Sequence, residues 1–133
     1  MKYLSLLFLS FSLNADELKI LRVVDADTFV VSAPFLPPPL KPQMPMRLSN
    51  ADAPGIGRWA NCDKENNLGH IAKTYVENLL NRSNTQKINL VGIDKYGRLL
   101  GNVLIDNKSL SDYLIENNLG KSYKGGTKSS WCN

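Results

Sequence analysis

Histidine and cysteine are scarce in this sequence: one histidine, His70, and two cysteines occur in 133 residues. A structural zinc site takes four nitrogen or sulfur ligands, so this composition argues against one. Beyond the N-terminal segment, no hydrophobic run approaches the roughly 20 residues that cross a bilayer, and no internal repeat is present. The length and the charged fraction of 21% are those of one globular domain.

Residues 1–15 have the layout of a secretory signal peptide. A positive start at Lys2 precedes an apolar or hydroxylic stretch over 3–13, and an acidic pair follows Ala15. We expect cleavage after Ala15, a mature domain over 16–133, and export to the periplasm or the extracellular medium. The alternative is a buried N-terminal strand or helix.

The two cysteines of an exported chain meet an oxidising compartment. The simplest interpretation is one intramolecular disulfide between Cys62 and Cys132. Two free thiols or an intermolecular bridge are the alternatives. Closing a loop of about 70 residues would contribute roughly 4 kcal/mol in the chain-entropy model.

Five β-like runs are expected, at about 18–24, 28–31, 46–48, 87–92 and 99–105. Between the second and third runs, the prolines from Pro34 to Pro45 predict an exposed loop without ladder pairing. A proline-rich partner motif is the alternative interpretation of this stretch.

Apolar residues at three-and-four spacing predict a helix over 68–82, with Ile71 among the inward side chains. Ser109 is placed to cap a second helix. Five short strands with a helix between the third and fourth have the order of an OB-fold β-barrel, on which two or three helices would pack. Strand content alone would also permit another small barrel.

Three short segments carry the charges that phosphodiester hydrolysis needs. They are 24–28 (VDADT), 47–54 (RLSNADAP) and 94–98 (DKYGR). Carboxylate oxygens hold hard cations such as Ca²⁺, a bound cation polarises a phosphoryl oxygen, and arginines hold phosphate oxygens bidentately. Each segment also has a plain interpretation, as aspartates in turns or arginines on a solvated surface.

The net charge of +4 fits attraction to a polyanion, although many secreted proteins are equally basic. The single histidine argues against nucleases that use a histidine base or a histidine pair.

Together, the three segments make the chain resemble the thermonuclease (staphylococcal-nuclease-like) family of secreted endonucleases. The resemblance runs from about Leu18 to Cys132, and 94–98 is its most specific part. The ending, with KSYKGG at 121–126 and Trp131 before the last cysteine, is similar to that of short bacterial members. The resemblance implies an OB-fold and metal-dependent endonucleolytic hydrolysis of DNA and RNA with little sequence preference. We expect the protein to be a monomer.

The resemblance implies a calcium site built from oxygen ligands. Asp27 and Asp52 would bind Ca²⁺ through their carboxylates, and Ala53 through its backbone carbonyl. Asp25 would help to orient these ligands.

The resemblance also implies which residues meet the substrate. Arg47 and Arg98 would hold the scissile phosphate. Tyr96 would stack against a base, Lys95 would attract a phosphate, and Tyr123 would line the far wall of the same groove.

Gly55 departs from the family pattern, which has Glu directly after the proline. That Glu is usually assigned to activate the attacking water, and a general base contributes about 10²–10⁴-fold in rate. Two routes remain: the cation alone activates the water, which we favour, or Glu65 replaces the missing base, with Asp63 as a further candidate. A smaller departure, Ala26 in place of Gly, is tolerable unless its turn needs a positive φ.

Two other functions stay open. Gly55 leaves possible a nucleic-acid-binding OB module with a weakened or lost catalytic site. The proline-rich loop leaves possible a small exported structural or interaction domain.

Overall fold

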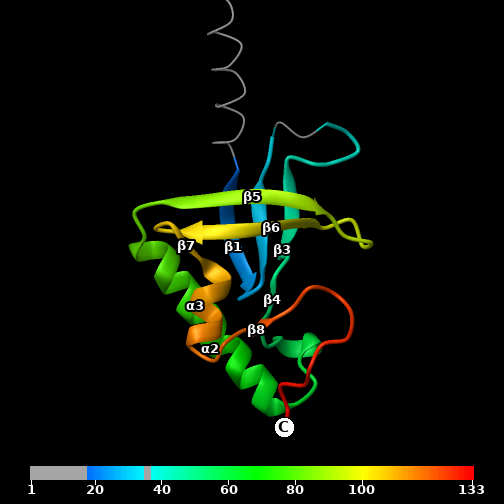
Figure 1. The fold of residues 1–133 in the computed structure, drawn as a ribbon. Helices are drawn as coiled ribbons and strands as arrows, with labels where there is room; N and C mark the ends of the chain where they lie inside the picture. The colour runs from blue at the N-terminus through cyan, green and yellow to red at the C-terminus, as the bar shows by residue number, and fades with distance from the viewer. Residues whose placement is uncertain (1–17, 35–36) are drawn as a thin grey trace, which may run out of the picture.

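Five strands form one curled sheet in the computed structural model, which describes residues 18–34 and 37–133 (Figure 1). The expected signal peptide, 1–15, lies outside the described residues. The strands are β1 (Lys19–Asp25), β2 (Thr28–Ser32), β3 (Gln43–Leu48), β5 (Gln86–Ile93) and β6 (Leu99–Ile105). Their order is β1-β2-β3-β6-β5, and the short β7 (Lys108–Ser109) extends the pairing of β6.

Neighbouring strands are antiparallel except β3 and β6, which run parallel. The sheet curls until β1 also contacts β5. This half-barrel of five mixed strands fits the OB-fold, so the expected fold class is confirmed. A separate two-stranded pairing joins β4 (Ala51–Asp52) to β8 (Lys121–Ser122), and it links the segment after β3 to the C-terminal tail.

The third strand starts earlier than the proline-rich sequence predicts. β3 begins at Gln43, and Pro45 lies within it, opposite Val30 of β2. Pairing with β6 begins only at Met46. Proline, which cannot donate a ladder hydrogen bond, is therefore accommodated where the other edge of β3 is still unpaired.

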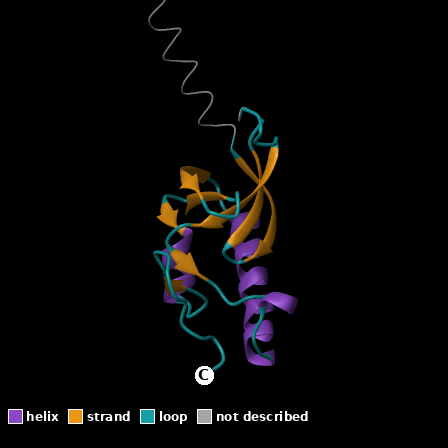
Figure 2. Ribbon diagram, turned by 90° about the vertical axis from the view of Figure 1, so that its right-hand side faces the viewer, coloured by secondary structure: helices purple, strands orange, loops and turns teal. Residues whose placement is uncertain are grey.

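Helix α2 (Asp63–Arg82) lies beneath the sheet, as Figures 1 and 2 show. It begins at Asp63 rather than Leu68, because the sulfur of Cys62 accepts the backbone N–H of Glu65 and caps the helix. A helix prediction that starts at the first apolar residue therefore omits this polar first turn. The expectation for Ile71 is wrong, since this side chain is 57% exposed.

The buried stripe of α2 is narrower than the apolar pattern suggests; it consists of Glu65, Gly69, Ala72, Val76 and Leu79. Helix α3 (Leu110–Glu116) follows β7, with Ser109 at its N-cap position. The largest fully buried side chains come from the sheet and both helices: Phe29, Val31, Met46, Leu48, Val76, Leu99, Val103, Ile105, Leu110 and Leu114.

The C-terminal tail returns to the beginning of α2, where Figure 1 shows the chain end beside the helix. A disulfide between Cys62 and Cys132 fixes this return, with 70 residues of separation. The intramolecular pairing is thus confirmed, and it stabilises the fold by roughly 4 kcal/mol in the chain-entropy model. Within the described residues, no helix combines the length and apolar character that a membrane span requires.

Candidate active site

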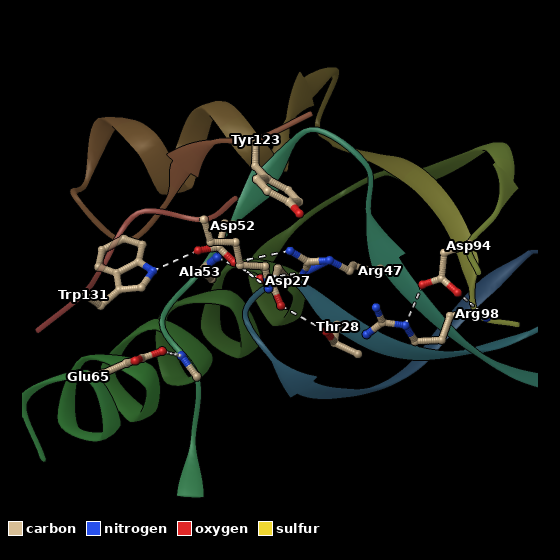
Figure 3. Close-up of polar contacts among 12 residues, drawn as sticks. Asp27, Thr28, Arg47, Asp52, Ala53, Glu65, Asp94, Arg98, Tyr123 and Trp131 are labelled. Carbon is tan, nitrogen blue, oxygen red and sulfur yellow. Dashed lines mark hydrogen bonds and ion pairs between the residues drawn. The ribbon is translucent and has the colours of Figure 1, made fainter. Parts of the chain in front are cut away.

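A buried arginine joins two buried aspartates at the centre of the site (Figure 3). Arg47 Nη1 lies 3.0 Å from Asp27 Oδ2, and Arg47 Nη2 lies 3.3 Å from Asp52 Oδ1. All three residues are at most 6% exposed. The sheet brings Asp27 and Arg47 together, because Thr28 at the start of β2 pairs with Arg47 in β3. The turn before Thr28 therefore delivers Asp27 to the guanidinium.

Hydrogen bonds fix the orientation of the Asp27 carboxylate. The hydroxyl of Thr28 donates to Oδ1 at 3.0 Å, and the backbone N–H of Ala53 donates to Oδ2 at 2.8 Å. Burial alone would raise the pKa of Asp27, but its interaction with Asp25, the charge of Arg47 and these hydrogen bonds hold that pKa below the ordinary value. Asp27 is therefore ionised over the physiological pH range.

Asp25 has the opposite electrostatic character. Burial, followed by the negative charge of Asp27, raises the pKa of Asp25 to about 8. Among the described residues, its Oδ1 is a buried oxygen without a hydrogen-bond partner. Ala26, between the two aspartates, is fully buried and does not have a positive φ, so alanine is accommodated there.

Arg98 directly precedes β6, in a turn that the Asp94 carboxylate stabilises. The Asp94 carboxylate accepts the backbone N–H groups of Tyr96 and Arg98 at 2.9 Å, and its Oδ2 lies 2.7 Å from Arg98 Nε. Burial would raise the pKa of Asp94, and the hydrogen bonds from Arg98 and Tyr96 lower it. Gly97 adopts a φ of +83°, which glycine allows without strain. The sequence alone predicts no role for Asp94, although its position within the segment 94–98 marks it as a candidate site residue.

The C-terminal tail also contacts the acidic pair. Lys128 Nζ lies 3.2 Å from Asp52 Oδ1, and the indole N–H of Trp131 donates to Asp52 Oδ2 at 3.0 Å. Arg47 and Lys128 both lie over the ring of Tyr123, at 5.4 and 5.6 Å from its centroid. The disulfide at Cys132 thereby holds Trp131 against Asp52. Lys128 and Trp131 carry no motif that marks them as site residues before the fold is known.

Two clefts meet at this cluster. The first, of about 350 Å³, is lined among others by Asp27, Arg47, Asp52, Ala53, Glu65 and Arg98. The second, of about 490 Å³, is lined among others by Lys95, Tyr96, Arg98, Tyr123 and Lys128. The structure therefore brings the expected metal ligands and arginines into one cleft and the expected groove residues into its neighbour. Asp25 lines neither cleft.

Glu65 lies in the first turn of α2 and lines the first cleft. Its carboxylate accepts hydrogen bonds from two backbone N–H groups. Its Oε2 accepts the N–H of Gly55 at 2.7 Å, and its Oε1 accepts the N–H of Asn61 at 3.0 Å. Space at Gly55 is already filled, because a Cβ added there would lie 2.5 Å from the carbonyl oxygen of Trp59. A Glu at this position would have to displace that backbone.

The donor set suits a hard cation such as Ca²⁺. Asp27 and Asp52 offer carboxylate oxygens, and Ala53 offers a carbonyl. Asp25, with its pKa raised to about 8, adds little negative charge at neutral pH. In the part of the chain that the structure describes, no group of three or more His, Cys, Asp or Glu side chains is arranged to hold a metal. A cation would thus rely on two carboxylates together with backbone or substrate oxygens, and it would compete with Lys128 for Asp52.

The curled sheet and this cleft of arginines and carboxylates define an OB-fold domain with a buried, charged site. The sequence matches the family model of the staphylococcal nuclease homologues over residues 45–130. The match covers more than half of the chain, and the protein belongs to that family. No curated protein matches the sequence. Membership supports a nuclease or nucleic-acid-binding function and, at the level of the family, a hydrolase with nucleic-acid substrates.

We predict that Arg47 and Arg98 differ sharply in their effect on stability. Arg47→Ala leaves two buried carboxylates without their shared partner and should lower the free energy of unfolding by about 3 kcal/mol or more. Arg98→Ala removes a partly exposed ion pair whose side-chain exposures are 33% and 13%, and should cost under about 1 kcal/mol. Urea denaturation in chelator measures both values. Equal losses would show that Arg47 does not neutralise the buried pair.

Proposed function

We propose that the protein is a Ca²⁺-dependent endonuclease that hydrolyses phosphodiester bonds of DNA and RNA with little sequence preference. One observation carries the proposal: Asp27, Asp52, Arg47 and Arg98 line a single cleft. Phosphate clamps and a carboxylate pair in one cleft suit hydrolysis of a phosphodiester, whereas binding alone needs only the positive groups.

A calcium ion held by Asp27, Asp52 and the Ala53 carbonyl would polarise a phosphoryl oxygen and supply an activated water. The two carboxylates would be kept in position by Thr28 and Trp131, which donate to them. Asp25 would help to orient these ligands.

The arginines would bind the scissile phosphate and stabilise the charge that builds up in the transition state. Arg98 uses Nε for its pair with Asp94, and its two Nη atoms carry four further N–H donors. Arg47 is oriented by two carboxylates and by the ring of Tyr123. Such fixed donors act without reorganisation during the reaction.

The second cleft would hold the nucleotide next to the scissile phosphate. Tyr96 is 72% exposed, with Lys95 Nζ 5.2 Å and Arg98 Cζ 5.6 Å from its ring centroid. An exposed ring among cations stacks on bases irrespective of their identity. Little sequence preference follows, because contacts to phosphates and ring faces do not read base edges.

The competing proposal is a nucleic-acid-binding OB module without efficient catalysis. It is supported by Gly55 and by the carbonyl of Trp59, which occupies the space that a side chain at position 55 would need. The buried carboxylate pair favours the enzyme, because a binder of polyanions gains nothing from negative charge in its cleft.

We further propose that the exported protein is a monomer with one domain over 16–133, located in the periplasm or outside the cell. The N-terminal sequence supports export, and the disulfide at Cys62 is consistent with an oxidising compartment.

Digestion of plasmid DNA tests the function directly. The purified protein should degrade DNA with Ca²⁺ and lose this activity in chelator. Arg98→Ala should reduce kcat by roughly 10²–10³-fold, the usual effect of removing one positioned donor, and Arg98→Lys should restore little, because lysine lacks the planar fork. Lys73→Ala, on α2 and outside both clefts, serves as the control. Undiminished cleavage in chelator would exclude the metal-dependent reaction.

Glu65→Gln separates the two routes to an activated water. If Glu65 were the base, kcat should fall roughly 10²–10⁴-fold and the acidic limb of the pH–rate profile should disappear. If the cation suffices, as we expect, kcat per folded molecule should change little and the profile should persist. The variant should melt at a lower temperature in either case, because Glu65 accepts two backbone N–H groups. Assays well below that melting temperature, corrected for the folded fraction, give the comparison.

A further inference from the structure

Trp59 is a large aromatic side chain left in solvent at the rim of the first cleft. It is 65% exposed and lines the same cleft as Asp52 and Arg98. Ile71 is similarly exposed, at 57%, but lies on α2 outside both clefts. Single exposed apolar residues are common on protein surfaces, so the position of Trp59 rather than its exposure needs an explanation.

The turn that carries Trp59 is anchored at several points. It is a 3₁₀ turn, η1 (Gly57–Trp59), and the backbone N–H of Gly57 donates to Asn66 Oδ1 at 2.7 Å. Within the turn, the N–H of Trp59 donates to the carbonyl of Ile56 at 3.2 Å. The disulfide at Cys62 follows directly. The ring is therefore presented by a fixed loop.

Close backbone packing holds this turn against Gly55. A Cβ at Gly55 would lie 2.5 Å from the Trp59 carbonyl oxygen, and a Cβ at Gly69 would lie 2.4 Å from the Gly55 carbonyl oxygen. The two glycines allow three segments to approach one another: η1, the residues that follow β4, and α2. The absence of side chains at 55 and 69 is thus a condition for placing Trp59 where it is.

The ring has a cation beside it. Arg58 Cζ lies 4.9 Å from the Trp59 ring centroid, and Arg58 is exposed. An exposed ring with an adjacent guanidinium is the combination by which proteins hold single-stranded nucleic acid, through base stacking and phosphate attraction.

The two clefts give this ring a place along the substrate. They share Arg47, Arg98 and Lys128, while Tyr96 lines only the second and Trp59 only the first. A strand whose phosphate lies on the shared arginines would reach an aromatic ring in each direction.

We propose that Trp59 and Arg58 form a nucleobase-stacking subsite on the opposite side of the scissile phosphate from Tyr96. Its ligand is an unpaired base of DNA or RNA. The placement relative to the scissile phosphate rests on the proposed function, whereas the stacking itself does not.

Fluorescence anisotropy with a labelled single-stranded decamer, in chelator to prevent hydrolysis, tests the subsite. Trp59→Ala should weaken binding roughly 5- to 150-fold, the range for one base–aromatic stack. Trp59→Phe should retain most of the affinity, and Ile71→Ala should bind like the parent protein. Melting temperatures of all variants confirm that the comparison concerns folded proteins.

A decamer that carries no bases separates stacking from a structural effect. The parent protein and Trp59→Ala should bind this abasic strand equally, because no base remains to stack. Unchanged binding of the normal decamer by Trp59→Ala, or an equal loss on both strands, would overturn the subsite. A protein that shows the base-dependent loss but never cleaves DNA would retain the subsite and refute the nuclease. A protein that cleaves DNA but shows no base-dependent loss in Trp59→Ala would refute the subsite and support the nuclease.

Discussion

The pairing of one buried guanidinium with two buried carboxylates is the interaction on which the site depends. Asp27 and Asp52 come from different segments, and both would be costly to bury as unpaired anions. Arg47 compensates both, at 3.0 and 3.3 Å. The cluster therefore contributes to folding and keeps two carboxylates together in the first cleft. Stability and function are coupled here, so any Arg47 variant must be judged on both.

A second constraint is the close packing around Gly55. The carbonyl of Trp59 lies against Gly55, and the carbonyl of Gly55 lies against Gly69. Glu65 closes the same region by accepting the Gly55 N–H. Position 55, which could carry a catalytic carboxylate, is thus taken up by close backbone packing. The acidic residues that line the first cleft are Asp27, Asp52 and Glu65.

Much of this arrangement can be predicted from the sequence, and the failures have local causes. The five strands and the disulfide follow from residue patterns, and 24–28, 47–54 and 94–98 mark the residues that meet in the cleft. The start of α2 is not predicted, because a cysteine sulfur caps it. The early start of β3 is not predicted either, because Pro45 is tolerated only where one edge of the strand is unpaired. Lys128 and Trp131 could not be predicted, since only the tertiary return of the tail brings them to Asp52.

We propose that Asp27 and Asp52, which Arg47 joins and orients, form a site for a calcium ion. Isothermal titration calorimetry of the mature protein with CaCl₂, in the absence of nucleic acid, is the decisive test. We expect one binding site, which is lost in the Asp27→Asn and Asp52→Asn variants and retained in Asp112→Asn, an exposed control on α3. Calcium binding that survives both substitutions, or no binding to the parent protein, would refute a calcium site at these two carboxylates.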